Sequence, residues 1–220
     1  MDLIERLLKI EVSALCDADK ALPVLDPDIR PMVPGIRMAG PAFTVTAEDD
    51  HLPVLSALAE ASPGDVLVIA TNGGTKAVLG ELFATEARRR GLAGVVIDGR
   101  CRDLAGLRTR GLPVFARGTT PASGSTVSRA PRNRPVRVGG LAVSPGDIVF
   151  GDDDGVVIAR AEQIEAALGT GEYIGRAERA MLDGMAGGTP LHDMTNHAAH
   201  TARLDAGEES ALAFEVEVDA

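Results

Sequence analysis

The stretch GLAGVVIDGRCRD, residues 91–103, decides how this chain folds. Gly91 follows three arginines, which is typical of the C-terminal end of a helix. The β-branched run at residues 95–97 predicts a short strand buried on both faces, and the Asp98-Gly99 pair ends it. Arg100, Arg102 and Asp103 follow on a polar loop. Because ligands of open α/β sheets bind outside the carboxyl ends of the strands, we expect chemistry at this loop.

The same alternation of strand and helix continues on both sides of this stretch. A buried strand at 66–70 leads through the glycine loop TNGGTK, at 71–76, into a helix expected from about residue 77 to 90. With the strand at 95–97 this makes a parallel crossover, which is right-handed by default. The periodicity predicts further strands at 38–47, 112–115, 136–143, 147–150 and 156–159, and helices at 2–16, 52–61 and 161–185. The sequence therefore predicts an α/β fold in a single domain.

Composition limits the class of protein. The chain has 220 residues, 45% of them hydrophobic but only 3% aromatic, so the core is built mainly from Ala, Val, Leu and Ile. The formal charge is −10, and the segment 205–220 holds acidic groups and no basic one. We therefore expect no nucleic-acid partner. Since no signal peptide and no long apolar run is visible, we expect a cytoplasmic protein that does not enter a membrane.

The Arg102-Asp103 pair is the first candidate site. A single carboxylate with several waters suits Mg²⁺ or Mn²⁺, and a neighbouring arginine can hold a carboxylate through two hydrogen bonds. Together they would clamp a 2-oxo acid, with the arginine on the developing enolate charge. The alternative is a structural ion pair in a loop.

The glycine loop and the following helix are the second candidate. Free N–H groups at a helix N-terminus bind anions, and Gly80 would leave the backbone uncovered there. Glu81 would act as a base or orient water, although the helix dipole favours an acidic residue at this place anyway. The spacing is not that of a phosphate-binding Walker loop. The alternative is that these glycines serve only close packing.

Other candidates have stronger structural explanations. Three consecutive aspartates at 152–154 precede a glycine, as in a solvated hairpin turn. His192, His197 and His200 lack the spacing of a metal motif. Cys101 lies between two arginines, which would lower its thiol pKa if it were exposed. Glu178 lies on the exposed face of the 161–185 helix, and Phe214, Val216 and Val218 alternate with acidic residues as a strand would.

Taken together, the segments resemble a known family. MAGPAFTV, PGDVLVIATNGG, GELFATEARRRGLAGVVIDGRCRD, LPVFARGTTP and GDDDGVVIA follow one another in the order and spacing of the RraA-like family. This family includes 4-hydroxy-4-methyl-2-oxoglutarate aldolases, oxaloacetate decarboxylases and protein inhibitors of ribonuclease E. The most specific part is Gly80-Glu81 followed by DGRCRD at 98–103.

The resemblance implies an αββα sandwich with a swivelling-domain-like topology, assembled as a homotrimer or hexamer with active sites between subunits. It implies that Asp103 anchors a divalent ion (Mg²⁺, with Mn²⁺ or Co²⁺ as alternatives), largely through waters. Arg102 would bind the pyruvyl group, and Glu81 would position metal waters or transfer a proton. The implied substrate-binding backbone covers Leu79, Gly80, Glu81 and Leu82, and a neighbouring subunit would supply Glu178.

From residues and resemblance together we expect a metal-dependent lyase. It would cleave a C–C bond of a small 2-oxo acid through a pyruvate enolate, as an aldolase, an oxaloacetate decarboxylase or both. Two alternatives remain: a diverged enzyme on the same scaffold in another pathway, such as secondary metabolism, and a non-catalytic binding protein related to ribonuclease regulators. The resemblance covers residues 1–190, and residues 191–220 form an extension expected to be partly flexible or to contact other subunits.

Overall fold

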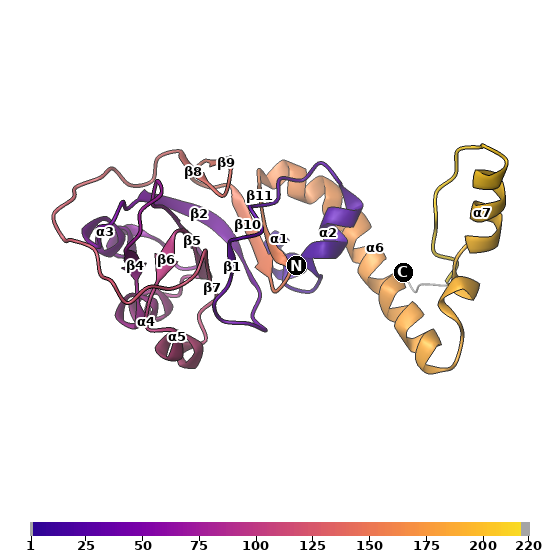
Figure 1. Ribbon diagram of the computed structural model, residues 1–220, viewed down its shortest axis with the longest axis horizontal. Helices are drawn as coiled ribbons and strands as arrows, with labels where there is room; N and C mark the ends of the chain where they lie inside the picture. The colour runs from indigo at the N-terminus through magenta and orange to yellow at the C-terminus, as the bar shows by residue number, and fades with distance from the viewer. Residues whose placement is uncertain (1, 217–220) are drawn as a thin grey trace.

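Parallel strands form the centre of the molecule in the computed structural model, which describes residues 2–216 (Figure 1). Within those residues the main sheet has seven strands in the order β1-β7-β5-β3-β2-β10-β11. The four central strands β7, β5, β3 and β2 run parallel, while β1, β10 and β11 pair antiparallel at the two sides. Their bounds are β1 (Arg30–Pro31), β7 (Val114–Ala116), β5 (Gly94–Asp98), β3 (Val66–Ala70), β2 (Met38–Thr46), β10 (Ile148–Asp152) and β11 (Gly155–Ala159). The predicted α/β fold is confirmed.

Alternating side chains on the central strands build two cores. Leu67 and Ile69 of β3 pack on the side covered by helices α3 (Leu52–Glu60), α4 (Glu81–Arg89) and α5 (Leu104–Arg110). Val66 and Val68 face the opposite side, against β10, β11 and the hairpin of β8 (Val136–Val138) and β9 (Leu141–Val143). Because both faces of β3 are covered, its five residues are all buried, as the uninterrupted apolar run predicted.

A third core lies on the far side of β10 and β11. Here α1 (Leu3–Leu7), α2 (Val12–Ala18) and the long α6 (Ala161–Ala186) pack together around Leu15, Phe150 and Leu168. Figure 1 places these helices at one end of the sheet, while α3, α4 and α5 lie at the other. The helix expected over 2–16 is thus two helices, because the chain is extended at Glu11 before α2 begins.

The helix expected from residue 77 begins four residues later. Ala77–Leu79 is instead a short buried strand, β4, which pairs with β6 (Arg100–Cys101) in a second, two-stranded sheet. Gly80 then precedes α4 in an extended conformation. Helix α5 was not predicted, and it directly follows the charged loop. The β4–β6 pair is therefore what brings Gly80 beside Arg102 and Asp103.

The C-terminal part extends away from the sheet as an arm (Figure 1). It comprises the end of α6, a 3-10 helix η1 (Leu191–Met194) and α7 (His197–Asp205). Met194 is the one buried side chain between residues 187 and 216. Phe214 forms an isolated antiparallel bridge with Thr195, and Val218 of the expected strand lies outside the described residues. In residues 2–216, no helix has the combination of length and apolar character that crossing a bilayer requires.

Candidate active site

A pocket of about 270 Å³ lies at the end of the β4–β6 pair and contains most of the predicted site. Its volume is a little below the range of about 300–1,000 Å³ for ligand pockets, which suits a small acid. The lining consists of His51, Gly80, Leu82, Phe83, Arg102, Asp103, Ser123 and Thr126. A second hollow shares Arg102 and Asp103 and continues along Leu104 and residues 119–121. The arginine and the aspartate therefore line both hollows.

Asp103 is held in an unusual backbone conformation. Its φ of 59° and ψ of 41° lie in the left-handed region, which costs energy for a residue other than glycine. One carboxylate oxygen accepts a hydrogen bond from the N–H of Glu81 over 3.1 Å. The same oxygen lies 3.5 Å from Nε of Arg102. Strain of this kind is typical of functional sites, and here it turns the carboxylate toward the start of α4.

Gly80 is required because Arg102 and Asp103 approach its backbone closely. A Cβ at this position would lie 2.4 Å from the Asp103 carboxylate and 3.0 Å from Cγ of Arg102. Real Cβ atoms do not come so close to other heavy atoms, so no larger residue fits without moving the pair. Gly80 was predicted as a site residue, and the close contact with Arg102 and Asp103 explains sterically why glycine is needed there.

Arg102 has an unused donor. Its Nε is buried and has no hydrogen-bond partner in the part of the chain that the structure describes. A buried donor without a partner costs about 1–3 kcal/mol, so such a group usually awaits a ligand or solvent. The backbone is fixed independently, since the Arg102 N–H donates to the carbonyl of Leu79 over 2.9 Å. Leu79 itself is fully buried in β4 and supports the site from behind.

The N-terminus of α4 opens onto the same pocket. The first N–H groups of any helix lack partners within that helix, and Leu82 and Phe83 of this first turn line the cavity. The Glu81 N–H is already used by Asp103. Since the first turn carries a partial positive charge, it favours an anionic ligand group.

Two predicted acidic residues lie elsewhere. The Glu81 carboxylate pairs with Arg110 of α5 and lies against Gly106, so it faces α5. Glu178 lies on α6, at the other end of the sheet from α4 and α5 (Figure 1). One chain alone therefore does not bring Glu178 to Arg102, and its expected supply by a neighbouring subunit stays a prediction.

His51 and Ser123 are pocket residues that sequence reasoning missed. The His51 ring nitrogen Nε2 lies 2.9 Å from the Ser123 hydroxyl and accepts a 3.2 Å hydrogen bond from the N–H of Gly124. Burial lowers the pKa of His51, and the positive charge of Arg102 lowers it further. The two residues are 72 positions apart and share no motif, so no spacing in the sequence points to them.

Asp50 fixes the loop that carries Ser123. Its carboxylate accepts hydrogen bonds from the Ser125 hydroxyl and from the N–H groups of Leu52, Val127 and Ser128. Burial opposes ionisation, but these four donors outweigh it and lower the pKa of Asp50 to about 2. The loop is therefore held by a carboxylate that stays ionised down to low pH.

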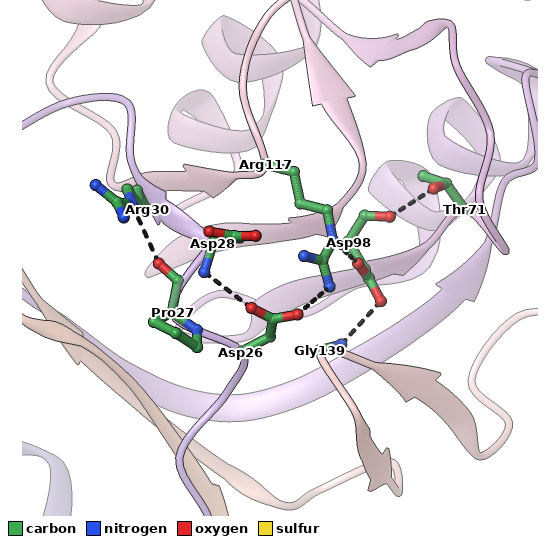
Figure 2. A network of polar contacts seen from close by, with 8 residues as sticks. All are labelled: Asp26, Pro27, Asp28, Arg30, Thr71, Asp98, Arg117 and Gly139. Carbon is green, nitrogen blue, oxygen red and sulfur yellow. Dashed lines mark hydrogen bonds and ion pairs between the residues drawn. The ribbon is translucent and has the colours of Figure 1, made fainter.

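Asp98, the first residue of the DGRCRD motif, has a structural role. Figure 2 shows its carboxylate between the Arg117 guanidinium and the N–H of Gly139, while Asp26 binds Arg117 from the other side. The Asp98 carbonyl accepts the Thr71 hydroxyl. The network ties β5 and β7 to the β8–β9 turn and leaves Asp98 no part in the pocket.

The remaining candidates have structural explanations. Burial raises the pKa of the Cys101 thiol to about 11, because the side chain is fully enclosed and not exposed between its arginines. Asp152 accepts from the N–H of Val12, and Asp153 accepts from the N–H of Gly35. The larger hollow beside them, about 470 Å³, is lined by these two carboxylates and by an Arg37–Glu11 pair. Its charged groups already have partners, so we assign it no chemistry.

The metal-ligand inventory is small. Residues 2–216 contain no group of three or more His, Cys, Asp or Glu side chains arranged around a common point, and this includes the C-terminal histidines. One oxygen of Asp103 is engaged by Glu81, and the other has no such bond. A lone carboxylate fits Mg²⁺, which keeps most of its waters, and does not fit a closed structural zinc site.

Comparison with known proteins identifies similar sequences and structures. The family model "Aldolase/RraA" matches residues 12–158. A protein of Halalkalibacterium halodurans, named "Putative 4-hydroxy-4-methyl-2-oxoglutarate aldolase", is 38% identical over 76% of this chain and 81% of its own length. A protein of Burkholderia multivorans with the same name is 37% identical over 66% of this chain and 93% of its own length.

Solved structures share the fold. The RNA-processing inhibitor RraA of Thermus thermophilis superposes with a TM-score of 0.64 at 28% identity, over 68% of this chain and 92% of that one. A Geobacillus kaustophilus protein described as an S-adenosylmethionine:2-dimethylmenaquinone methyltransferase gives 0.65 at 34% identity, over 69% and 95%. These names span different activities, so the fold alone does not select one, and the site must do so.

Proposed function

The chain belongs to the RraA-like family, and from this premise we propose that it is a divalent-metal-dependent lyase forming a pyruvate enolate from a 2-oxo acid. The curated relatives named as aldolases support the reaction class. The observation that carries the proposal is the buried Nε of Arg102, which makes no hydrogen bond within residues 2–216 and lies beside the strained Asp103 at the N-terminus of α4. These groups are a cation, an anion and a helix terminus meeting in one small pocket.

The residues divide the work by charge. The first turn of α4 binds the carboxylate of the 2-oxo acid, because its N–H groups and dipole favour an anion. Arg102 donates to the oxygen on which enolate charge develops, and this stabilises the product of C–C cleavage more than the substrate. Retro-aldol cleavage and oxaloacetate decarboxylation both leave this enolate, so one site supports both reactions.

Asp103 would hold the divalent ion, with water completing its shell. When bound there, Mg²⁺ or Mn²⁺ supplies Lewis-acid polarisation of the 2-oxo acid. Glu81 holds Arg110 in the present arrangement, and a role in positioning water would require its carboxylate to leave this partner. Cleavage needs no Schiff-base lysine on this scheme, and none of the three lysines lines the pocket.

Assembly would complete the site. Glu178 and the pocket lie at opposite ends of the single-chain structure, and we propose a homotrimer or hexamer in which Glu178 of one copy reaches Arg102 of another. Between residues 187 and 216 the arm has one buried side chain, and we expect it to contact other copies. Light scattering after size exclusion measures the number of subunits, and Glu178→Gln measures whether the carboxylate matters.

The test is pyruvate release from 4-hydroxy-4-methyl-2-oxoglutarate and from oxaloacetate, with Mg²⁺ or Mn²⁺ and again with EDTA. We expect metal-dependent release above the non-enzymatic background, lost in Asp103→Ala and in Arg102→Ala. Full activity in both variants would exclude this site. No turnover by the unmodified protein would favour a diverged enzyme or a binding protein on the same scaffold.

A further inference from the structure

The pocket contains a serine–histidine pair that the proposed enolate chemistry does not use. Arg102, Asp103 and the α4 terminus act on the pyruvyl half of a substrate, and His51 and Ser123 line the same cavity. Resting on the proposed function, we propose that Ser123 and His51 form the proton relay that deprotonates the 4-hydroxyl of a 4-hydroxy-2-oxo acid. The relay would make this chain an aldolase and not only a decarboxylase.

Hydrogen bonding defines the state of the histidine ring. Nε2 accepts the N–H of Gly124, so the ring proton lies on Nδ1, and the backbone of Val78 is the further hydrogen-bond partner. The Ser123 hydroxyl, 2.9 Å away, therefore donates to Nε2 and not the reverse. Its other contact, the Gly124 carbonyl at 3.5 Å, is too long to compete. The serine oxygen keeps lone pairs that can accept a proton from a substrate.

The surroundings keep the histidine neutral and fixed in place. The ring is 9% exposed and its edge meets Phe83, with 5.7 Å between the ring centres. Among charged groups Arg102 disfavours a second ring proton, while Asp50 favours it. Burial and Arg102 dominate, so the ring is ready to accept a proton at neutral pH.

The loop that presents Ser123 is also fixed. The Ala77 N–H donates to the Ala122 carbonyl and the His51 N–H donates to the Ser125 carbonyl, over 2.9 and 2.8 Å. Gly124 fits because a Cβ there would lie 2.2 Å from the carbonyl oxygen of Asp49. The serine and the histidine are thus positioned by separate backbone contacts, as a pre-formed base requires.

The relay couples proton transfer to cleavage of the C3–C4 bond. Ser123 Oγ takes the proton of the 4-hydroxyl while its own proton passes to Nε2 of His51, which thereby loses the hydrogen bond from the Gly124 N–H. The C3–C4 bond breaks, its electron pair enters the enolate of the pyruvyl half, and the oxygen at C4 becomes a carbonyl. The imidazolium then returns its proton to water, and the enolate takes a proton from water at C3. Decarboxylation of oxaloacetate has no hydroxyl proton to remove and does not need the relay.

This difference gives the experiment. We would measure kcat for cleavage of 4-hydroxy-4-methyl-2-oxoglutarate and for decarboxylation of oxaloacetate, both with Mg²⁺, in Ser123→Ala and His51→Asn. We expect cleavage to fall about 100-fold in each variant, and decarboxylation to change by less than about threefold. Ser123→Thr, which keeps the hydroxyl, should restore much of the cleavage. Ser128→Ala in the same loop is the matched control, because its side chain lies outside the pocket.

Two readouts distinguish a base from a structural role. As the pH falls and His51 becomes protonated, kcat for cleavage should fall, whereas kcat for decarboxylation should not. His51→Asn should remove this difference between the two reactions. The ring ¹⁵N shifts of His51, assigned with the same variant among four histidines, should report the Nδ1–H tautomer. Ser123 is at an exposed loop position, so Ser123→Ala keeps the test valid if His51→Asn does not fold.

Four results would overturn the relay. Equal losses in both reactions would mean that the pair only supports the pocket. Unchanged cleavage in Ser123→Ala would mean that another group removes the proton. Absence of both reactions in the unmodified protein would remove the proposed function, and the relay with it, whereas decarboxylation without cleavage would remove the relay alone.

Discussion

The backbone N–H of Glu81 donates a 3.1 Å hydrogen bond to the side chain of Asp103. The first residue of α4 and the residue that precedes α5 are thereby joined, although 22 positions separate them. The bond leaves one carboxylate oxygen of Asp103 for a ligand. It also makes the position of the Asp103 carboxylate depend on its close contact with the backbone of Gly80.

Replacing Gly80 by alanine should damage the site more than the fold. The new methyl group would displace Asp103 and Arg102, since its ideal position is 2.4 Å from the carboxylate. We expect kcat/KM to fall by about 100-fold and the free energy of unfolding to fall by about 1–3 kcal/mol. Gly169→Ala on α6 is the control, because its Cβ would meet nothing within 4 Å. The control should gain about 0.5–1 kcal/mol in urea unfolding. Unchanged kinetics in Gly80→Ala would contradict the close approach.

Arg102→Lys tests whether charge alone suffices at position 102. Lysine keeps the positive charge but lacks the planar donor set and the buried Nε. We expect kcat for pyruvate formation to fall by about 100-fold, while substrate binding weakens less. Arg108→Lys, an exposed change on the neighbouring α5, should leave both constants unaltered. An active Arg102→Lys enzyme would mean that the guanidinium makes no specific contact with the enolate.

Asp50→Asn should loosen the loop that carries Ser123. The amide cannot accept from all four donors, so at pH 7 we expect a loss of about 2 kcal/mol in the free energy of unfolding. The pKa of Asp50 in the folded protein, about 2, lies below its ordinary value of 3.8. The stabilisation is therefore complete above about pH 5 and is lost as the pH falls toward 2. The difference between the two proteins should shrink over that interval in urea titrations. A difference that does not depend on pH would exclude the carboxylate charge as its cause.

Arg117→Ala should lower stability without changing catalysis. The substitution leaves Asp98 and Asp26 without their shared cation, in a network whose side chains do not line the pocket (Figure 2). Because all three side chains are partly exposed, we expect a cost of about 1–2 kcal/mol and a Tm lower by about 3–6 °C. Arg137→Ala, which removes one exposed contact to the Gly140 carbonyl, should shift the Tm less. A change in kcat at 20 °C would argue against a purely structural role for this network.

Local patterns predicted the central sheet because its strands are buried on both faces. The runs at β3 and β5 are uninterrupted and apolar, and the structure places both strands there, side by side and parallel. The loop after β5 was identified for the same reason, since strand ends in such sheets carry ligands. Arg102 and Asp103 follow directly.

The predicted helix and strand boundaries were wrong where tertiary contacts overrode the local conformational preference. Ala77, Val78 and Leu79 fit a helical pattern, yet they pair with β6 and form a strand. The short α5 carries one fully buried residue, Leu107, so it has no periodic signal. His51, between β2 and α3, contacts Ser123 because the fold brings that segment against the loop that carries Ser123. No local spacing in the sequence encodes this contact.

The hydrogen bonds between Asp50 and the loop that carries Ser123 affect how this pocket can diversify. Two of its four hydrogen bonds come from the backbone N–H groups of Val127 and Ser128, which any residue except proline can supply. The side chain of Val127 is 78% exposed, and its identity does not affect the bond. Evolution can therefore change residues 126–128 without moving Ser123. Because Thr126 of this segment lines the pocket, a laboratory library at that position would sample new substrates on an unaltered backbone.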